Sequence, residues 1–271
     1  MVLDRKYPNS DAKAEVKRIG PKQGLKVMGD NLLSHFMNLS AFLNNVINNS
    51  IIENNVSLGP LSLKRFVNLE SLDISGHKIT KLDVSDCPHI RELHCSRNQL
   101  TNIDISNNRQ IEIEQFGCSD NHLTNLDFTG LNRIEKIFCC GCKLTSLEFL
   151  KTLNPVKLVT LRMNDNKFPA QDLSCFTPFI NLERLCIVNN PFYGSLKPLR
   201  DFTYLKEIGI ANTDVDNGLE YLPENFFNFN ATASDLGLTG AYFKRKLYCT
   251  GKLAEQLKDY KIENDPLRNY D

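Results

Sequence analysis

The sequence predicts an α/β fold: a right-handed solenoid, curved into a horseshoe, with one parallel β-sheet on its concave face. The main observation is that residues 69–106 carry one pattern of apolar residues twice, 21 residues apart. The two sets are Leu69, Leu72, Ile74 and Ile79, then Ile90, Leu93, Cys95 and Leu100. The segments that follow them, TKLDVS and TNIDIS, also match. Self-similarity at a fixed interval indicates stacked repeats, because one unit of this size cannot bury its own apolar residues.

Both copies fit the pattern L-x-x-L-x-L-x-x-N-x-L. Its fourth and sixth places alternate, which predicts a short strand with one buried face. The Asn place lies where the chain leaves that strand. An amide side chain there can bond to backbone groups of neighbouring coils that would otherwise be buried without partners. Copies begin at residues 69, 90, 113, 134, 158, 182 and 205, and their Asn places hold His77, Asn98, Asn121, Cys142, Asn166, Asn190 and Thr213.

These seven copies resemble the leucine-rich-repeat family between residues 69 and 215. The return segments TKLDVS, TNIDIS, TNLDFT and TSLEFL are similar to its short subclass, which occurs in expanded fungal families, alone or beside kinase-like domains. That resemblance implies short extended or irregular convex segments with little helix. The later copy intervals of 24, 24 and 23 residues predict helical turns at 169–176 and 198–202. His77 departs from the family pattern and predicts an edge repeat, and a degenerate eighth copy is predicted at 226–236.

The expected organisation is one elongated domain with capped ends. Residues 1–60 form the N-terminal cap, 61–236 the solenoid and 237–271 a C-terminal capping segment. In the N-terminal cap we predict a short helix over 11–19 and an amphipathic helix over 25–47, because apolar residues there recur at intervals of three and four. This cap can also include a degenerate first repeat at 41–51. In the C-terminal segment, Leu253, Leu257 and Tyr260 predict one face of a helix over 251–262 that docks on the last coil.

Composition excludes several classes of function. Lys plus Arg is 32 and Asp plus Glu is 32, which gives no reason to expect a nucleic acid or an anionic membrane as partner. No apolar run reaches the roughly 18–20 residues that span a bilayer, and the first residues do not resemble a secretory signal. Cys95, Cys118 and Cys139 share an inward strand place, so they indicate small buried residues rather than disulfides. We therefore expect a cytoplasmic monomer, although four glycosylation sequons point weakly the other way.

No catalytic, metal or cofactor site is predicted. Cys139 and Cys142 form a C-x-x-C pair that suggests a metal or redox site. However, the repeat pattern already explains both residues, and a zinc site needs two further ligands. No histidine is spaced with a nucleophile and a third orienting group, and there is no phosphate-binding loop or kinase signature. The chain is therefore not expected to be an enzyme.

The candidate binding residues are those whose strand places point outward on the concave face. They are His94, Phe138, Cys140, Arg162, Arg184, Cys186 and Val188. Phe138 and Arg162 fall side by side, and an exposed aromatic beside Arg is typical of an interface hot spot. Gly117 is expected to leave the Phe ring open on one side, and the two arginines to offer guanidinium groups to a carboxylate. The alternative is that Phe138 is a tolerated surface aromatic.

The fold and this surface suggest non-catalytic recognition of a protein partner of unknown identity. Fold alone does not determine the partner. One alternative is a regulatory or adaptor region in a kinase or ubiquitin-ligase pathway. Another is a reader of small molecules or glycans, and a third is a family member that no longer has a partner.

Overall fold

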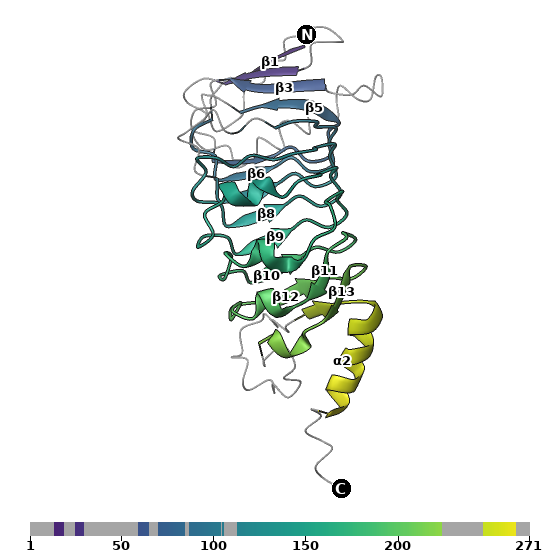
Figure 1. Ribbon diagram of the computed structural model, residues 1–271. Helices are drawn as coiled ribbons and strands as arrows, with labels where there is room; N and C mark the ends of the chain where they lie inside the picture. Colours follow the sequence, from purple (N-terminus) through teal and green to yellow (C-terminus); the bar gives the residue numbers. More distant parts are fainter. Residues whose placement is uncertain are drawn as a thin grey trace, which may run out of the picture.

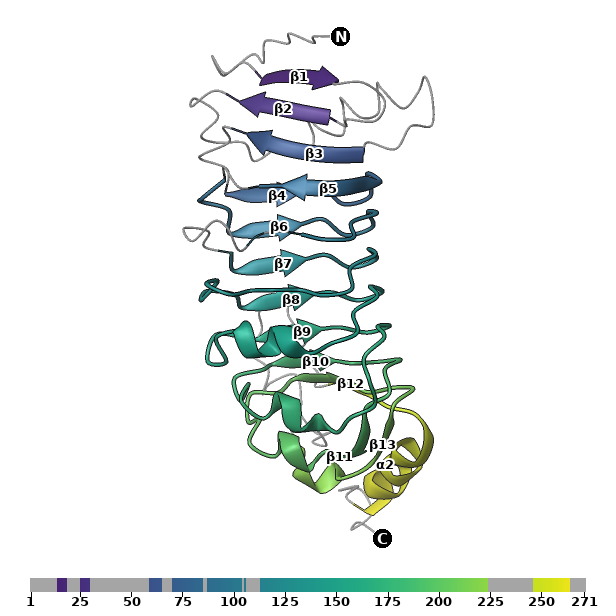
Figure 2. The same ribbon diagram turned by 45° about the horizontal axis from the view of Figure 1, so that its top comes forward.

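The computed structural model describes residues 14–18, 25–29, 59–64, 70–84, 87–103, 105, 113–223 and 246–263. Over these residues the chain winds into coils that stack one on the next, with strands aligned along the stack (Figures 1 and 2). The predicted parallel-sheet solenoid is therefore confirmed. None of the described helices is both long enough and apolar enough to cross a membrane.

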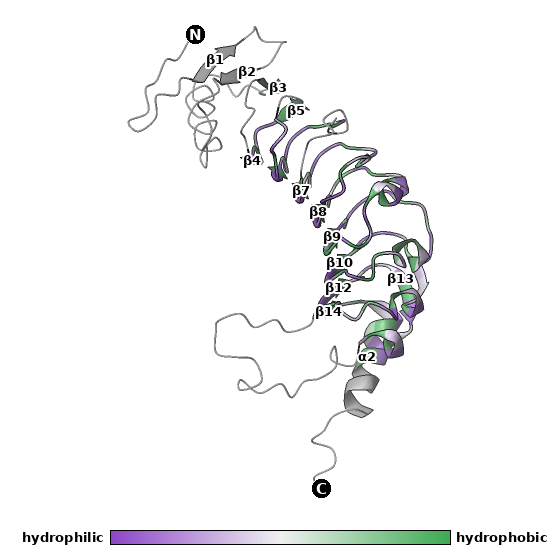
Figure 3. Ribbon diagram, turned by 90° about the vertical axis from the view of Figure 1, so that its left-hand side faces the viewer, coloured by the Kyte–Doolittle hydropathy of each residue, from purple (hydrophilic) through white to green (hydrophobic). Residues whose placement is uncertain are grey.

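One face carries an eight-stranded parallel sheet to which successive coils contribute three residues each. In spatial order its strands are β4 (Ser71–Asp73), β6 (Glu92–His94), β7 (Gln115–Gly117), β8 (Lys136–Phe138), β9 (Thr160–Arg162), β10 (Arg184–Cys186), β12 (Glu207–Gly209) and β14 (Lys246–Tyr248). The middle residue of each strand pairs with the middle residue of the next, so equivalent side chains form straight columns. Figure 3 shows this sheet on the inner side of an arc.

The last strand of this sheet comes from an unexpected place. β14 pairs with β12, and Ile208 lies opposite Leu247. Leu247 follows Ile208 by 39 residues, whereas the other copies recur every 21 to 24 residues, so a fixed interval does not reveal it. The concave sheet thus extends into the segment assigned to the C-terminal cap. The degenerate copy predicted at 226–236 lies outside the described residues, and β14 holds the sheet position that it was expected to fill.

The outer side of the arc is made of short extended and 3₁₀-helical segments. These are β5 (Ile79–Asp83), η1 (Glu148–Thr152), η2 (Leu173–Phe176), β11 (Tyr193–Ser195), η3 (Lys197–Leu199), β13 (Asp214–Asn217) and η4 (Leu219–Tyr221). The helical turns predicted at 169–176 and 198–202 correspond to η2 and η3 with small differences in their bounds. The extra residues of the longer copies therefore form single turns on the outer side.

At the N-terminal end, a second sheet covers the stack in the order β1 (Ala14–Arg18), β2 (Leu25–Gly29), β3 (Gly59–Lys64), β5. The last three strands are parallel and β1 is antiparallel to β2. The predicted helices are therefore wrong for residues 14–18 and 25–29, and the rest of both lies outside the described residues. Both segments, AEVKR and LKVMG, alternate with period two, and a strand can pair the backbone groups at the end of a stack where a helix cannot.

At the C-terminal end, α2 (Gly251–Glu263) begins after the two residues that follow β14 and agrees with the helix predicted over 251–262. Leu253 is fully buried in the common core, and Leu257 packs against that core. The side-chain amide of Gln256 donates to the backbone oxygen of Asp216 in β13 at 3.1 Å. The helix thus docks beside β13 through both apolar and polar contacts.

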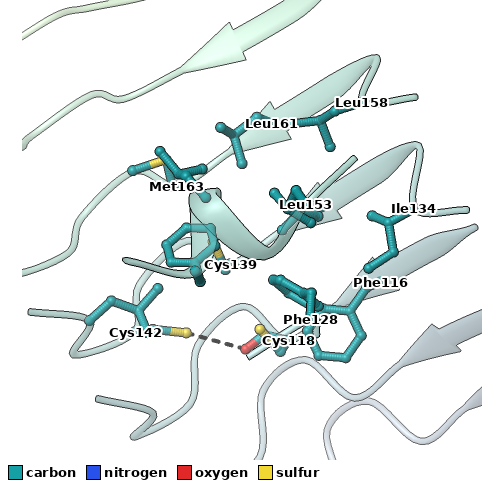
Figure 4. Packing of buried hydrophobic residues seen from close by; sticks show 14 of the residues in the cluster. Phe116, Cys118, Phe128, Ile134, Cys139, Cys142, Leu153, Leu158, Leu161 and Met163 are labelled. Carbon is teal, nitrogen blue, oxygen red and sulfur yellow. Dashed lines mark hydrogen bonds between the residues drawn. The ribbon is translucent and has the colours of Figure 1, made fainter. Parts of the chain in front are cut away.

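The interior between the two sides is filled by apolar residues from every described coil. Phe128 makes edge-on ring contacts with Phe116 at 5.4 Å and with Phe149 at 6.0 Å. Cys118 and Cys139 point into the same interior (Figure 4), as their strand places predict. Because one core runs through all these coils, each coil depends on its neighbours for burial.

Buried asparagines connect consecutive coils, as the pattern predicts. Asn121 accepts a hydrogen bond from the Leu100 amide at 2.9 Å. Its own amide donates to the backbone oxygens of Cys95 at 3.0 Å and Cys118 at 2.8 Å. Asn98, Asn166 and Asn190 make equivalent sets of bonds. Each amide therefore satisfies backbone groups of its own coil and of the preceding one.

Three copies depart from this arrangement. The Cys142 thiol donates to the backbone oxygen of Cys118 at 3.3 Å, which keeps one contact between coils (Figure 4). The Thr213 hydroxyl bonds only within its own coil, to the oxygen of Ile210 at 2.7 Å. His77 has no side-chain amide, and its backbone amide donates to the Asn98 side chain of the next coil at 3.0 Å. The asparagine contacts are therefore present at four of the seven copies, those of Asn98, Asn121, Asn166 and Asn190.

Replacing Asn121 by Ala should reduce the free energy of unfolding by about 1–3 kcal/mol, because buried backbone groups lose their partners. Asn166→Ala should behave alike. Thermal and urea unfolding of each variant measures this. Asn125→Ala is the control, because Asn125 is exposed. Equal losses for Asn121→Ala and Asn125→Ala would contradict the role assigned to the buried amides.

Candidate functional site

The outward-facing residues of the concave sheet form columns along the arc. The first column, formed by the first residue of each strand from β4 to β12, contains Ser71, Glu92, Gln115, Lys136, Thr160, Arg184 and Glu207. The last residue of each strand forms a second outward column, called the middle column below. It contains Asp73, His94, Gly117, Phe138, Arg162, Cys186, Gly209 and Tyr248. Phe138 and Arg162 are register neighbours on β8 and β9, as the sequence predicts.

The central feature of this face is a charged cluster from three strands. Arg162 reaches past β10 to the carboxylate of Glu207, with its Nη2 at 2.9 and 3.1 Å from the two oxygens. Arg184 approaches the same carboxylate with Nε at 3.6 Å. The side chains of Arg162, Arg184 and Glu207 are 38%, 27% and 15% exposed. The two arginines are therefore already engaged by an internal carboxylate, and they are not open in the way the sequence suggested.

Small residues make room for this cluster. Cys186 and Gly209 follow Arg162 along the middle column, and a methyl group on Gly209 would lie 3.3 Å from the Cys186 sulfur. Cys186 is only 5% exposed, so it offers a partner little surface. Burial, and next the nearby Glu207 carboxylate, raise the pKa of its thiol to about 12. The protonated thiol donates weakly to Glu207, with the sulfur 3.6 Å from the carboxylate oxygen.

The cluster has more hydrogen-bond donors than acceptors. The Arg162 Nε and the Thr160 hydroxyl are buried and have no partner within the described residues. Arg184 makes only the long ion pair with Glu207, and no side-chain hydrogen bond to any described residue. One carboxylate serves two guanidinium groups, and Lys136 lies on the adjoining strand. This part of the face therefore carries excess positive charge and unused donors.

The N-terminal half of the face is arranged differently. Glu92 accepts from the Ser71 hydroxyl at 3.2 Å and from the Gln115 amide at 3.1 Å. The His94 ring occupies the space above Gly117, where an added methyl group would meet its Nδ1 at 2.7 Å. The expectation of an uncovered gap beside Phe138 is therefore wrong, because the longer His94 side chain fills the room that Gly117 leaves.

The predicted binding residues come from neighbouring strands. Phe138, Arg162 and Arg184 belong to β8, β9 and β10, and the His94 ring of β6 lies over Gly117 of β7, the strand beside β8. Cys140 and Val188 are half-buried and lie on either side of Asn164, whose side-chain oxygen accepts from the Val188 amide at 2.9 Å. The surface that could contact a partner is therefore centred on Phe138 and the arginines.

Sequence reasoning missed two residues of this surface. Glu207 directly follows Arg184 in the first column, and opposite charges in adjacent strands tend to pair, so its role could have been inferred. Tyr248 is 46% exposed at the end of the middle column, but it became visible only with β14. Sequence reasoning placed the turn after each strand at the Asn place, but it did not predict the backbone conformation of that turn.

That turn has its own repeated geometry. The residue before the Asn place adopts a left-handed backbone in all seven copies, and Gly, Asn and Asp are the residues that favour this conformation. These residues are Gly76, Arg97, Asp120, Gly141, Asp165, Asn189 and Asn212. Asn212 donates from its side chain to that of Asn189 at 2.7 Å. This hydrogen bond links the turns of two neighbouring copies at the edge of the concave face.

The described residues contain no group of three or more His, Cys, Asp or Glu side chains placed to hold a metal. Each of the nine cysteines has a free thiol. Cys139 and Cys142, the C-x-x-C pair, are both buried among apolar neighbours, where the repeat pattern places them. Burial raises the pKa of the Cys118 and Cys139 thiols well above the ordinary value. Both thiols therefore stay protonated and unreactive at neutral pH.

No protein-family model matches the sequence, and comparison with curated proteins finds no match. Among solved structures, the functional domain of InlJ from Listeria monocytogenes, which includes a cysteine ladder, is similar at 26% identity and a TM-score of 0.44, over 57% of this chain and 38% of that one. Internalin C2 from Listeria monocytogenes is similar at 21% identity and a TM-score of 0.47, over 55% of this chain and 65% of that one. A leucine-rich-repeat protein of Leptospira interrogans is similar at 18% identity and a TM-score of 0.42, over 58% of this chain and 48% of that one. The chain thus spans less than two thirds of the length of each.

The raised pKa values lead to a labelling prediction. In the folded protein at pH 8, Cys118 and Cys139 should react with iodoacetamide at least about 100-fold more slowly than in urea, because only an exposed thiolate reacts and unfolding returns the pKa to about 8.5. Mass spectrometry of peptides after timed labelling measures each site separately. Labelling of both residues at the same rate with and without urea would contradict their burial.

Proposed function

We propose that this chain is a non-catalytic recognition module that binds a protein partner on the central part of its concave face. The binding surface consists of Phe138, Arg162, Arg184, Val188 and Tyr248. The observation that supports it most is the half-exposed Phe138 lying directly beside Arg162, since aromatic and arginine side chains dominate the energy of protein interfaces.

Two further properties of the face support this function. The backbone beneath it is held by paired strands and buried asparagines, so its side chains are presented on a rigid surface and lose little entropy on binding. Exposed Tyr248 adds a second aromatic at one end of the same column. A face with aromatic residues at two places and charge between them suits an extended protein segment lying along the columns.

We also propose that the protein works in a reducing compartment such as the cytoplasm. The support is its use of cysteine as an interior residue: Cys87, Cys95, Cys118, Cys139 and Cys142 are all buried with free thiols. Interior thiols are compatible with such a compartment because nothing there drives them toward oxidation.

The binding surface can be tested with Phe138→Ala. Affinity purification with the wild-type chain first identifies the partner, and calorimetry then compares the variants. Phe138→Ala should weaken binding by about 2 kcal/mol, which is roughly 30-fold, because an aromatic anchor is lost. Its thermal unfolding should change little, since the ring lies outside the buried core.

The matched control is Asn102→Ala, an exposed residue in the segment that returns along the outer side. It should bind as the wild type does. If Asn102→Ala abolishes partner binding while Phe138→Ala binds normally, the partner uses another face and the proposal fails.

A further inference from the structure

We propose that Arg162 and Arg184 form a carboxylate-binding site, and that Glu207 occupies this site in the free protein in place of an acidic group of the partner. The inference rests on the proposed function and names the chemistry of the partner: an acidic side chain or a chain-terminal carboxylate within an extended protein segment.

The first argument is geometric. Glu207 shows that a planar carboxylate fits between the two guanidinium groups, with Arg162 Nη2 at 2.9 and 3.1 Å from its oxygens. Arg184 stands farther off, with Nε at 3.6 Å from the same group. Guanidinium groups bind carboxylates best through two parallel hydrogen bonds, and neither arginine has that arrangement with Glu207. Each therefore has donor capacity for a second carboxylate.

The second argument is the unused donors. The buried Arg162 Nε has no acceptor among the described residues, and neither has the Thr160 hydroxyl, which belongs to a residue only 2% exposed. A buried donor without a partner is unfavourable, so an acceptor that reaches it gains more than a surface contact would. Both residues belong to β9, where Thr160 pairs in register with Arg184 and Arg162 pairs with Cys186. The unused donors therefore lie on the strand next to Arg184.

The third argument is charge. Two arginines share one carboxylate, and Lys136 adds a further positive charge on the adjoining strand β8. A partner segment that carries an acidic group would neutralise this excess, whereas a basic segment would be repelled. Because the chain as a whole has zero formal charge, the positive centre is a local property of this face.

Glu207 then sets the strength of binding. An incoming carboxylate must either displace Glu207 or share the arginines with it, and both weaken the observed affinity. Removing the charge of Glu207 should therefore strengthen the binding of acidic ligands. A purely structural ion pair predicts the opposite, since its loss would only disturb the surface. This difference makes the proposal testable without knowledge of the natural partner.

The probes are three biotinylated peptides with amidated ends, (Gly-Glu)₄, (Gly-Gln)₄ and (Gly-Lys)₄, and a (Gly-Gln)₄ peptide with a free carboxyl end. Binding to the full chain is measured by biolayer interferometry at low ionic strength. We expect the (Gly-Glu)₄ probe to bind at least about 10-fold more tightly than the amidated (Gly-Gln)₄ probe, and (Gly-Lys)₄ not to bind. If the free-ended (Gly-Gln)₄ probe binds better than its amidated form, the site also takes a chain terminus.

Variants assign this binding to the cluster. Arg184→Gln should weaken the (Gly-Glu)₄ complex about 10-fold, and Glu207→Gln should strengthen it about 5-fold, because Gln keeps the shape and removes the competing charge. Lys143→Gln and Glu220→Gln are the controls: both are exposed, and each makes the same change in net charge as its counterpart. Both controls should bind as the wild type does. Thermal unfolding of all variants confirms that they are folded.

The proposal is overturned if the acidic and neutral probes bind alike, if Glu207→Gln weakens acidic binding, or if Lys143→Gln weakens it as much as Arg184→Gln. A phosphoserine peptide that binds far more tightly than (Gly-Glu)₄ would reassign the site to phosphate. Failure of the proposed function looks different. In that case the purified partner would be insensitive to Phe138→Ala, whatever the acidic probes do.

Discussion

A buried asparagine amide that bonds to two coils at once is the interaction on which the rest of the structure depends. The chain must turn away from each strand inside the molecule, where water cannot satisfy its backbone groups. Asn98, Asn121, Asn166 and Asn190 supply the missing donors and acceptors at four of these turns. Cys142 makes one such contact with the preceding coil, whereas the Thr213 hydroxyl bonds only within its own coil. The amides therefore hold the buried turns in place, while the backbone hydrogen bonds between strands set the spacing of the columns on the concave face.

Those columns explain why charge gathers in one part of the face. Parallel strands in perfect register place equivalent side chains side by side, so a charge in one coil directly meets the residues of the next. In the N-terminal half, Glu92 finds neutral partners on both sides. In the centre, Arg162 and Arg184 both turn to Glu207. The same scaffold therefore presents a balanced polar half and a positively charged centre.

The sequence predicts the interior much better than the surface. Apolar places and asparagines follow one pattern because the core forces each coil into the same shape, so the sheet, its register and the pairing of Phe138 with Arg162 are all predictable. The position of an arginine side chain is not, because it depends on whether its neighbours are small. Cys186 and Gly209 allow Arg162 to reach a strand beyond its neighbour, and Gly117 allows His94 to fill a gap. The N-terminal strands were missed because a helical spacing farther along the chain outweighed a short alternation.

Leu247 pairs with Ile208 although it follows 39 residues later in the sequence, so the geometry of the sheet does not depend on the length of the connecting chain. β14 takes its register from hydrogen bonds to β12, not from the number of residues that lead to it. Lengthening a connection costs little entropy once it is already long. A strand can therefore join the end of this sheet after an interval much longer than the repeat, while the concave columns keep the same arrangement.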